Sequence, residues 1–114
     1  MDMEVQTKLL MEQFSKSKKL LVAIGNETRQ GIMTALIHPE CEGMRVGEIK
    51  EKTHLSRPAV SHHLKILLDT EVIGVNRVGT KNFYYLKLGG EWQSLVGLIN
   101  NIEKLRALEE ENDE

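Results

Sequence analysis

A stretch of the chain from Leu55 to Asp69 concentrates side chains that donate hydrogen bonds. Its donors are a guanidinium, a hydroxyl, an imidazole and an ammonium group, from Arg57, Ser61, His62 and Lys65. No carboxylate accompanies them before Asp69, although a solvated helix face usually mixes acids with its lysines. Such donors suit phosphate oxygens and purine edges in the major groove of double-stranded DNA. The chemistry predicted for this stretch is therefore the binding of DNA.

The same stretch has the features of a helix with a defined first residue. Ser56 is a favoured N-cap residue, and Pro58 falls in the first turn, where its missing N–H removes no hydrogen bond. Spacings of four and three residues predict an apolar stripe that faces a core, formed by Val60, Leu64 and Leu67. From the rest of the helix, the residues predicted to contact DNA are Ser56, Arg57, Pro58, Ser61, His62 and Lys65.

A shorter helix is predicted directly before this one. Residues 46–53 place Val46 and Ile49 on one side, and residues 53–55 are few enough to form a tight turn. A short helix, a brief turn and a second helix with a polar outer face make the helix-turn-helix pattern of DNA-binding proteins. We expect His63 to pack beside the shorter helix.

Two strands are predicted after the helix pair, over residues 72–78 and 82–88. Both are enriched in Val, Ile, Phe and Tyr, and Gly79-Thr80-Lys81 between them provides a hairpin turn. The hairpin would form a wing, from which Arg77, Thr80 and Lys81 are predicted to reach backbone phosphate or the minor groove. A plain exposed edge is the alternative for these charges, and the preceding helix favours the DNA contact.

Three segments resemble the ArsR-type (arsenic-repressor-like) family of bacterial transcriptional regulators. Residues 55–67 are very close to its recognition-helix signature, residues 25–29 to its Asp/Asn-x-Thr-Arg helix start, and residues 78–86 to its wing. The resemblance covers residues 20–88 in one register, which is more specific than a lone motif. It implies a mainly α, winged helix-turn-helix fold with a small β-hairpin. It also implies a homodimeric repressor that releases double-stranded operator DNA when an inducer weakens binding.

The metal-binding positions of that family are not filled by ligands in this chain. By the resemblance, a cysteine pair would fall at Arg45 and Gly47, and residues 92–108 contain no His, Cys or Asp for a site on the last helix. His38 and Cys41 lie close together in a loop, but with two flanking glutamates they make a poor tetrahedral set. We therefore expect no metal, no cofactor, and an inducer that the sequence does not identify.

Helices are predicted at both ends of the chain. Residues 5–24 are helical in character, with Ser15–Lys19 as a candidate break, and Gly25 ends the helix. Residues 92–108 carry an apolar face too broad for one small domain to cover, which predicts a dimer formed through the terminal helices. Packing of this helix on its own domain is the alternative. The predicted interface comprises Leu9, Leu10, Phe14, Trp92, Leu95, Val96, Ile99, Ile102 and Leu105.

The remaining segments complete one predicted domain over residues 1–108. A helix capped by Asn26 is expected to bury Ile32, Met33, Leu36 and Ile37. Residues 109–114 are expected to form a disordered acidic tail.

The charge of the chain is segregated along the sequence. A net charge of −2 over 114 residues looks unfavourable for a DNA-binding protein. However, residues 44–88 hold eight Lys and Arg against four Asp and Glu, a net +4, while the rest holds seven against thirteen, a net −6. The positive part coincides with the predicted helix-turn-helix and wing.

Other functional classes receive little support from the sequence. An enzyme is not expected, because there is no Gly-rich phosphate loop and no nucleophile with a suitable base. No apolar run is long enough to span a membrane, and the single Cys41 excludes an intrachain disulfide, so we expect a cytoplasmic protein. Two alternatives stay open: a winged-helix module that binds only proteins, and a metal-responsive repressor with an atypical site. The acid-free helix face favours DNA over a protein partner.

Overall fold

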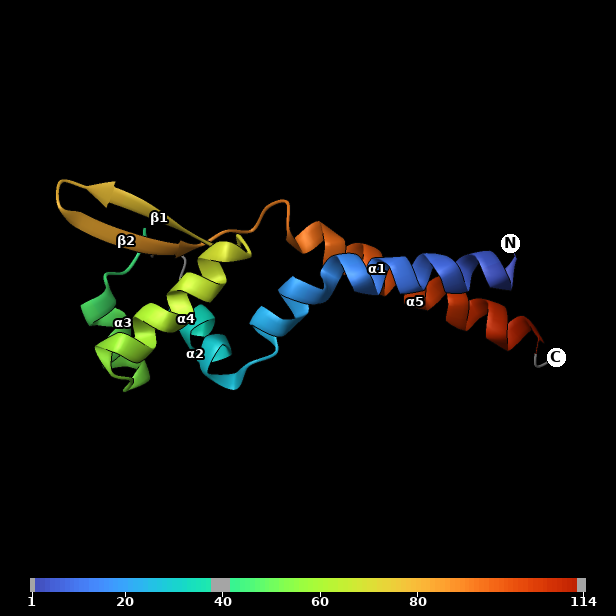
Figure 1. Ribbon diagram of the computed structural model, residues 1–114, viewed down its shortest axis with the longest axis horizontal. Coiled ribbons are helices and arrows are strands. Elements are labelled where there is room, and N and C mark those ends of the chain that lie inside the picture. The colour runs from blue at the N-terminus through green and yellow to red at the C-terminus, as the bar shows by residue number, and fades with distance from the viewer. Residues whose placement is uncertain (1, 38–41, 113–114) are drawn as a thin grey trace.

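The computed structural model describes residues 2–37 and 42–112 of the chain. In order, the elements are α1 (Met3–Ile24), α2 (Glu27–Leu36), α3 (Val46–Thr53), α4 (Arg57–Asp69), β1 (Ile73–Val78), β2 (Lys81–Leu86) and α5 (Trp92–Asn112). The two strands form one antiparallel hairpin, and all other elements are helices. Figure 1 shows α2, α3 and α4 grouped beneath this hairpin, while α1 and α5 extend away together. This arrangement confirms the predicted mainly α fold with a two-stranded wing.

The core forms where the apolar faces of α2, α3 and α4 meet. Ile32, Ile49, Val60 and Leu67 are completely buried there, and Leu64 nearly so. The predicted stripe on α4 is thus confirmed as its inward side. Ile37, expected in this core, is instead 64% exposed, because α2 ends one residue earlier, at Leu36, and the backbone of Ile37 is extended.

The predicted helix starts are confirmed by side-chain hydrogen bonds. Ser56 Oγ accepts from the backbone N–H of Ala59 at 3.3 Å, and Pro58 lies in the first turn of α4. Asn26 caps α2 by accepting from the backbone N–H of Arg29 at 3.0 Å. Each cap satisfies an N–H that the first turn leaves without a partner inside the helix.

The wing is a regular hairpin with a two-residue turn. Its register pairs Ile73 with Leu86 and Val78 with Lys81, so Lys81 is the first strand residue and not part of the turn. Gly79, the first turn residue, has φ of +64°, a left-handed conformation that glycine adopts without steric cost. At the ends away from the turn, both strands are shorter than predicted: β1 begins at Ile73 and β2 ends at Leu86.

Helices α1 and α5 pack along one another and form an arm on the helix-turn-helix body (Figure 1). The molecule measures 60 × 24 × 24 Å as a result. The predicted break at Ser15–Lys19 is wrong: α1 is a single helix, and Ser17 is fully buried against α5. Its hydroxyl and the Gln13 amide donate to the Ser94 carbonyl at 3.3 and 2.7 Å. The polar residues therefore serve helix packing.

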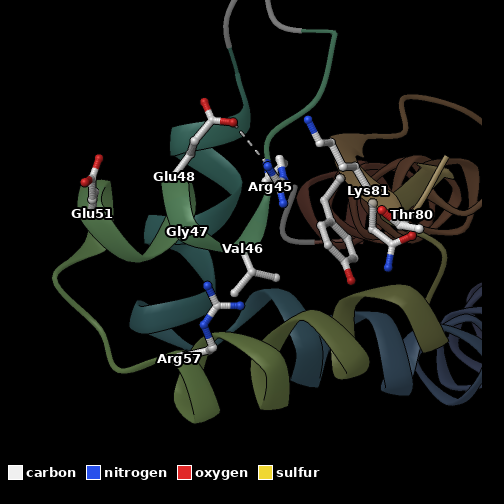
Figure 2. Close-up of a pocket in the computed structure, with 10 residues that line it drawn as sticks. Arg45, Val46, Gly47, Glu48, Glu51, Arg57, Thr80 and Lys81 are labelled. Carbon is white, nitrogen blue, oxygen red and sulfur yellow. Dashed lines mark hydrogen bonds between the residues drawn. The ribbon is translucent and has the colours of Figure 1, made fainter. Parts of the chain in front are cut away.

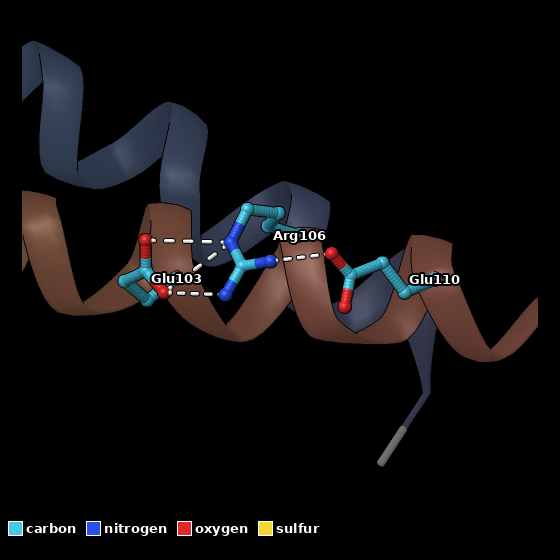
Figure 3. A network of polar contacts seen from close by, with 3 residues as sticks. All are labelled: Glu103, Arg106 and Glu110. Atoms are coloured by element: carbon cyan, nitrogen blue, oxygen red, sulfur yellow. Dashed lines mark hydrogen bonds and ion pairs between the residues drawn. The ribbon is translucent and has the colours of Figure 1, made fainter.

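The last turns of α5 differ from the disordered tail expected from residue 109. The helix continues through Asn112, and of the predicted tail only residues 113–114 lie outside the described part of the chain. Figure 3 shows Arg106 between Glu103 and Glu110, donating hydrogen bonds to both carboxylates. Pairs spaced by three and four residues support a helix, and the Arg106 guanidinium lowers the pKa of Glu103.

Across the described residues, no helix combines the length and apolar character needed to cross a membrane.

Candidate nucleic-acid interface

The outer side of α4 is built as the sequence predicts. Ser61, His62 and Lys65 are exposed on it, whereas the opposite side of the helix is buried in the core. Ser56, Arg57 and Pro58, at the start of the helix, are exposed as well. Asp69 is the only carboxylate on this helix and lies at its last residue. The helix therefore presents donors to solvent over almost its entire length.

The backbone of Met44 attaches the wing to the helix-turn-helix. Its N–H and carbonyl exchange hydrogen bonds of 2.8 Å with Tyr84 of β2, forming an isolated antiparallel bridge. Gly43 makes this approach possible, since its φ is +134° and a Cβ there would lie 2.9 Å from the Cβ of Phe83. The bridge brings Arg45, the next residue, to the wing.

A pocket of about 520 Å³ lies between the wing, the start of α3 and the start of α4. Three cationic side chains line it, from Arg45, Arg57 and Lys81. Two carboxylates, from Glu48 and Glu51, line it too, and Figure 2 shows both pointing away from Arg57. Glu48 also accepts from the backbone N–H of Arg45 at 3.3 Å. The pocket thus gathers positive charge from three separate segments.

Sequence reasoning identified only part of this pocket. Arg57, Thr80 and Lys81 were predicted to contact DNA, and all three line it. Arg45 and Tyr84 were not predicted. The bridge from Met44 to Tyr84 brings them together, and no local pattern in the sequence encodes that pairing. The one local feature that accompanies the pairing is Gly43, whose positive φ directly precedes Met44.

The Arg57 side chain lies against the first turn of α3. Figure 2 shows it extending from α4 toward Val46 and Gly47, and its Nη2 atom would lie 3.9 Å from a Cβ added to Gly47. A side chain at Gly47 would therefore begin in ordinary van der Waals contact with this guanidinium. On the wing, Arg77 donates from Nε to the carbonyl of Gly79 at 3.2 Å, which directs its side chain toward the turn.

His63 contacts Arg29 of α2, a partner that the sequence did not predict. Its Nδ1 atom is 3.2 Å from Nη1 of Arg29, a residue of α2 that is 7% exposed. The two imidazoles of His62 and His63 meet edge to face, with ring centroids 5.2 Å apart. Burial lowers the pKa of His63, and the charges of Arg29 and His62 lower it further. Arg29, a buried cation, thus gains an acceptor from α4.

The residues predicted to form the dimer interface divide into two groups. Trp92 and Leu95 are partly buried against the core of their own chain. Val96, Ile99 and Ile102 are 46%, 53% and 40% exposed, and their three-residue spacing places them on one side of α5. On α1, Leu9 and Phe14 are 41% and 48% exposed, while Leu10 is half-buried; Leu105 of α5 is half-buried too. The arm therefore carries an apolar surface, defined by Leu9, Phe14, Val96, Ile99 and Ile102.

Metal ligands do not gather in the described part of the chain. Over residues 2–37 and 42–112, no group of three or more His, Cys, Asp or Glu side chains is placed to hold an ion. The loop residues His38 and Cys41 lie outside the described residues. Arg45 and Gly47, where the family resemblance would place a cysteine pair, both line the cationic pocket.

Comparisons with known proteins agree on one class. Residues 26–74 match the family described as "Bacterial regulatory protein, arsR family". The chain is 35% identical over 82 residues to the transcriptional repressor SdpR of Bacillus subtilis, covering 72% of this chain and 88% of that protein. A second relative, the HTH-type transcriptional regulator Rv2034 of Mycobacterium tuberculosis, is 36% identical over 64 residues, covering 56% of this chain and 57% of that protein.

Solved structures with this fold are similar over most of the chain. NolR from Sinorhizobium fredii superimposes with a TM-score of 0.62 at 25% identity, covering 81% of this chain and 88% of that one. An ArsR-like transcriptional regulator from Rhodococcus sp. RHA1 gives a TM-score of 0.69 at 19% identity, over 90% and 87% of the two chains. At that identity the second comparison shows the fold alone.

Proposed function

This chain belongs to the ArsR family of bacterial regulatory proteins and is a DNA-binding transcriptional regulator, and on this premise we propose that it is a homodimeric repressor that binds an inverted-repeat operator without a metal effector. The observation that carries the proposal is the outer side of α4, which is exposed and free of carboxylates before Asp69. The surface fits a polyanion, because phosphate and base edges are rich in acceptors.

In the proposed complex, α4 lies in the major groove and reads base edges. Arg57 offers two parallel donors, which match the O6 and N7 acceptors of guanine. Ser61 and His62 act on neighbouring bases or phosphates, and Lys65 on the backbone. Arg45 and Lys81 line the pocket together with Arg57. In the proposed complex they bind phosphates where the DNA backbone passes between α3 and the wing. Arg77 and Thr80 at the wing turn would add contacts to phosphate or the groove edge.

The proposed dimer forms through the apolar surface of the arm. Ile99 and its neighbours on α5 are about half exposed in the single chain, and a two-helix arm that projects from a small body has no other element to cover them. A partner arm of the same sequence would cover this surface in a symmetric interface. Such a dimer presents two α4 helices to successive major grooves, which requires half-sites about 34–36 Å apart.

Repression is the mode of action that we propose, with an inducer still to be identified. Steric exclusion is the simplest mechanism for a regulator of this size, since a dimer bound at a promoter blocks the polymerase. The relative SdpR is named a transcriptional repressor, and that name supports this choice over activation. Because the protein would act on the chromosome, we place it in the cytoplasm.

The test is selection of DNA from the genome of the source organism. Purified protein is mixed with sheared genomic DNA, and the bound fragments are sequenced and footprinted. We expect enrichment of a few promoter fragments that share an inverted repeat with half-sites one helical turn apart. Recovery of random fragments in proportion to their abundance would refute sequence-specific binding. Binding of proteins but not of duplex DNA would favour the interaction module.

A further inference from the structure

Arg29 is a buried cation without an acidic partner among the described residues. It is 7% exposed, and the two ion pairs of the described chain both belong to Arg106. Its guanidinium instead donates to the carbonyls of Ala23 at 2.6 Å and Val22 at 3.1 Å. Both carbonyls lie in the last turn of α1, at the negative end of the helix dipole. The third contact, from Nη1, goes to His63 Nδ1 at 3.2 Å.

The chemistry of this contact defines the protonation of His63. A guanidinium has only donors, so Nδ1 must accept, and the ring is then neutral with its proton on Nε2. A second proton on Nδ1 would point an N–H at the Arg29 cation and break the hydrogen bond. The charged and titratable groups at His63 are Arg29 from α2 and His62 on α4 itself, while α1 contributes only the carbonyls that hold Arg29.

These hydrogen bonds link two parts of the molecule with different tasks. His63 belongs to α4, whose outer side is proposed to read DNA, and Val22 and Ala23 belong to α1, which forms the arm with α5. The orientation of α4 relative to the arm determines whether two reading helices of a dimer match two half-sites. A contact between α4 and the end of α1 therefore controls a quantity on which operator recognition depends.

We infer that Arg29 and His63 are positioning residues, which hold the recognition helix against the end of α1 in the orientation that the operator requires. The inference rests on the proposed function, because the operator provides its principal measurement. Neither Arg29 nor His63 is proposed to contact DNA, so both would affect operator recognition only through the position of α4. It also predicts that operator recognition weakens in mild acid, when His63 takes up a proton. The lowered pKa of His63 agrees with this direction, since the folded state favours the neutral ring.

The experiment compares His63→Asn with the control variant His54→Asn, which replaces an exposed histidine in the turn between α3 and α4. Asparagine Oδ1 occupies nearly the place of histidine Nδ1 and can accept from Arg29, but it does not titrate. The backbone of His54 is left-handed, with φ of +57°, a conformation that asparagine tolerates, so the control also removes one imidazole without adding backbone strain. Affinities for the operator and for a scrambled duplex are measured at about pH 7.5 and about pH 5.5, a range in which histidine titrates.

We expect the wild type and His54→Asn to lose operator preference by about tenfold or more in acid, because protonation of His63 removes a hydrogen bond to a buried charge. His63→Asn should keep its preference at both pH values. His63→Lys, a permanent cation, should bind the operator weakly at both. The inference is overturned if the profile of His63→Asn follows the wild type, or if the wild-type profile is flat.

A second measurement does not depend on DNA. Nitrogen NMR of the labelled imidazoles should show His63 at neutral pH with its proton on Nε2 and an unprotonated, hydrogen-bonded Nδ1. A proton on Nδ1 would refute the contact with Arg29 even if the operator data agreed. A protein that binds no duplex would refute the proposed function alone, and the tautomer would still decide whether Arg29 holds His63.

Discussion

Truncation of Ile99 to alanine should weaken the dimer without unfolding the chain. Ile99 is 53% exposed in the single chain, so about half of its burial energy is available to a partner. Full burial of such a side chain contributes about 1.5–3 kcal/mol, which leaves roughly 0.8–1.5 kcal/mol. In a symmetric dimer the change occurs twice, giving about 1.5–3 kcal/mol, or roughly a 10- to 150-fold rise in Kd.

Sedimentation equilibrium over a range of protein concentrations measures this effect. The control is Ile37→Ala, which removes the same atoms from a side chain that is 64% exposed but lies at the end of α2. We expect the dimer Kd of this control to match the wild type, and the thermal unfolding of both variants to remain similar at high concentration. The reasoning is refuted if the wild type is monomeric at micromolar concentration, or if Ile99→Ala dimerises like the control.

Three further predictions concern DNA and metal binding. Arg57→Ala should cost about 1–3 kcal/mol of operator affinity and relax the base preference at one position of each half-site; unchanged selectivity in a binding-site selection would show that another residue reads the bases. Arg45→Gln and Lys81→Gln should weaken binding to operator and random duplexes alike. Each should also reduce the slope of log affinity against log salt concentration by about two units per dimer, whereas the control Lys104→Gln on α5 should leave this slope unchanged. Zinc, cadmium or arsenite, added in equimolar amounts, should not release operator DNA from the wild type or from Cys41→Ser. A fluorescence titration that shows metal-induced release from the wild type alone would assign Cys41 a ligand role.

Local signals in the sequence were sufficient to predict α4 and the wing as elements of the fold. Ser56, Pro58 and the stripe of Val60, Leu64 and Leu67 are local signals, because caps and helical spacing act within a few residues. For the same reason, the wing was evident from its β-branched and aromatic residues around a glycine turn. The charge pattern along the sequence also assigns the positive part of the chain to these elements.

Boundaries between elements were less well determined by local signals. Ser15–Lys19 looked like a break in the first helix, but Ser17 is buried where α5 offers the Ser94 carbonyl as an acceptor. The tail from residue 109 looked disordered, but the pairing of Arg106 with Glu110 accompanies a helix that reaches Asn112. In both cases a polar composition predicts loss of regular structure, whereas in the folded chain the polar side chains have hydrogen-bond partners within reach.

Contacts between distant segments were decided by the tertiary structure alone. The bridge from Met44 to Tyr84 brings Arg45 to the wing, and the path of α1 brings its last carbonyls to Arg29, which then reaches His63. Neither contact has a period or a fixed spacing that a sequence could display. They arise because buried donors and acceptors must find partners once the core has brought their elements together, and which partners are near is a property of the packed chain.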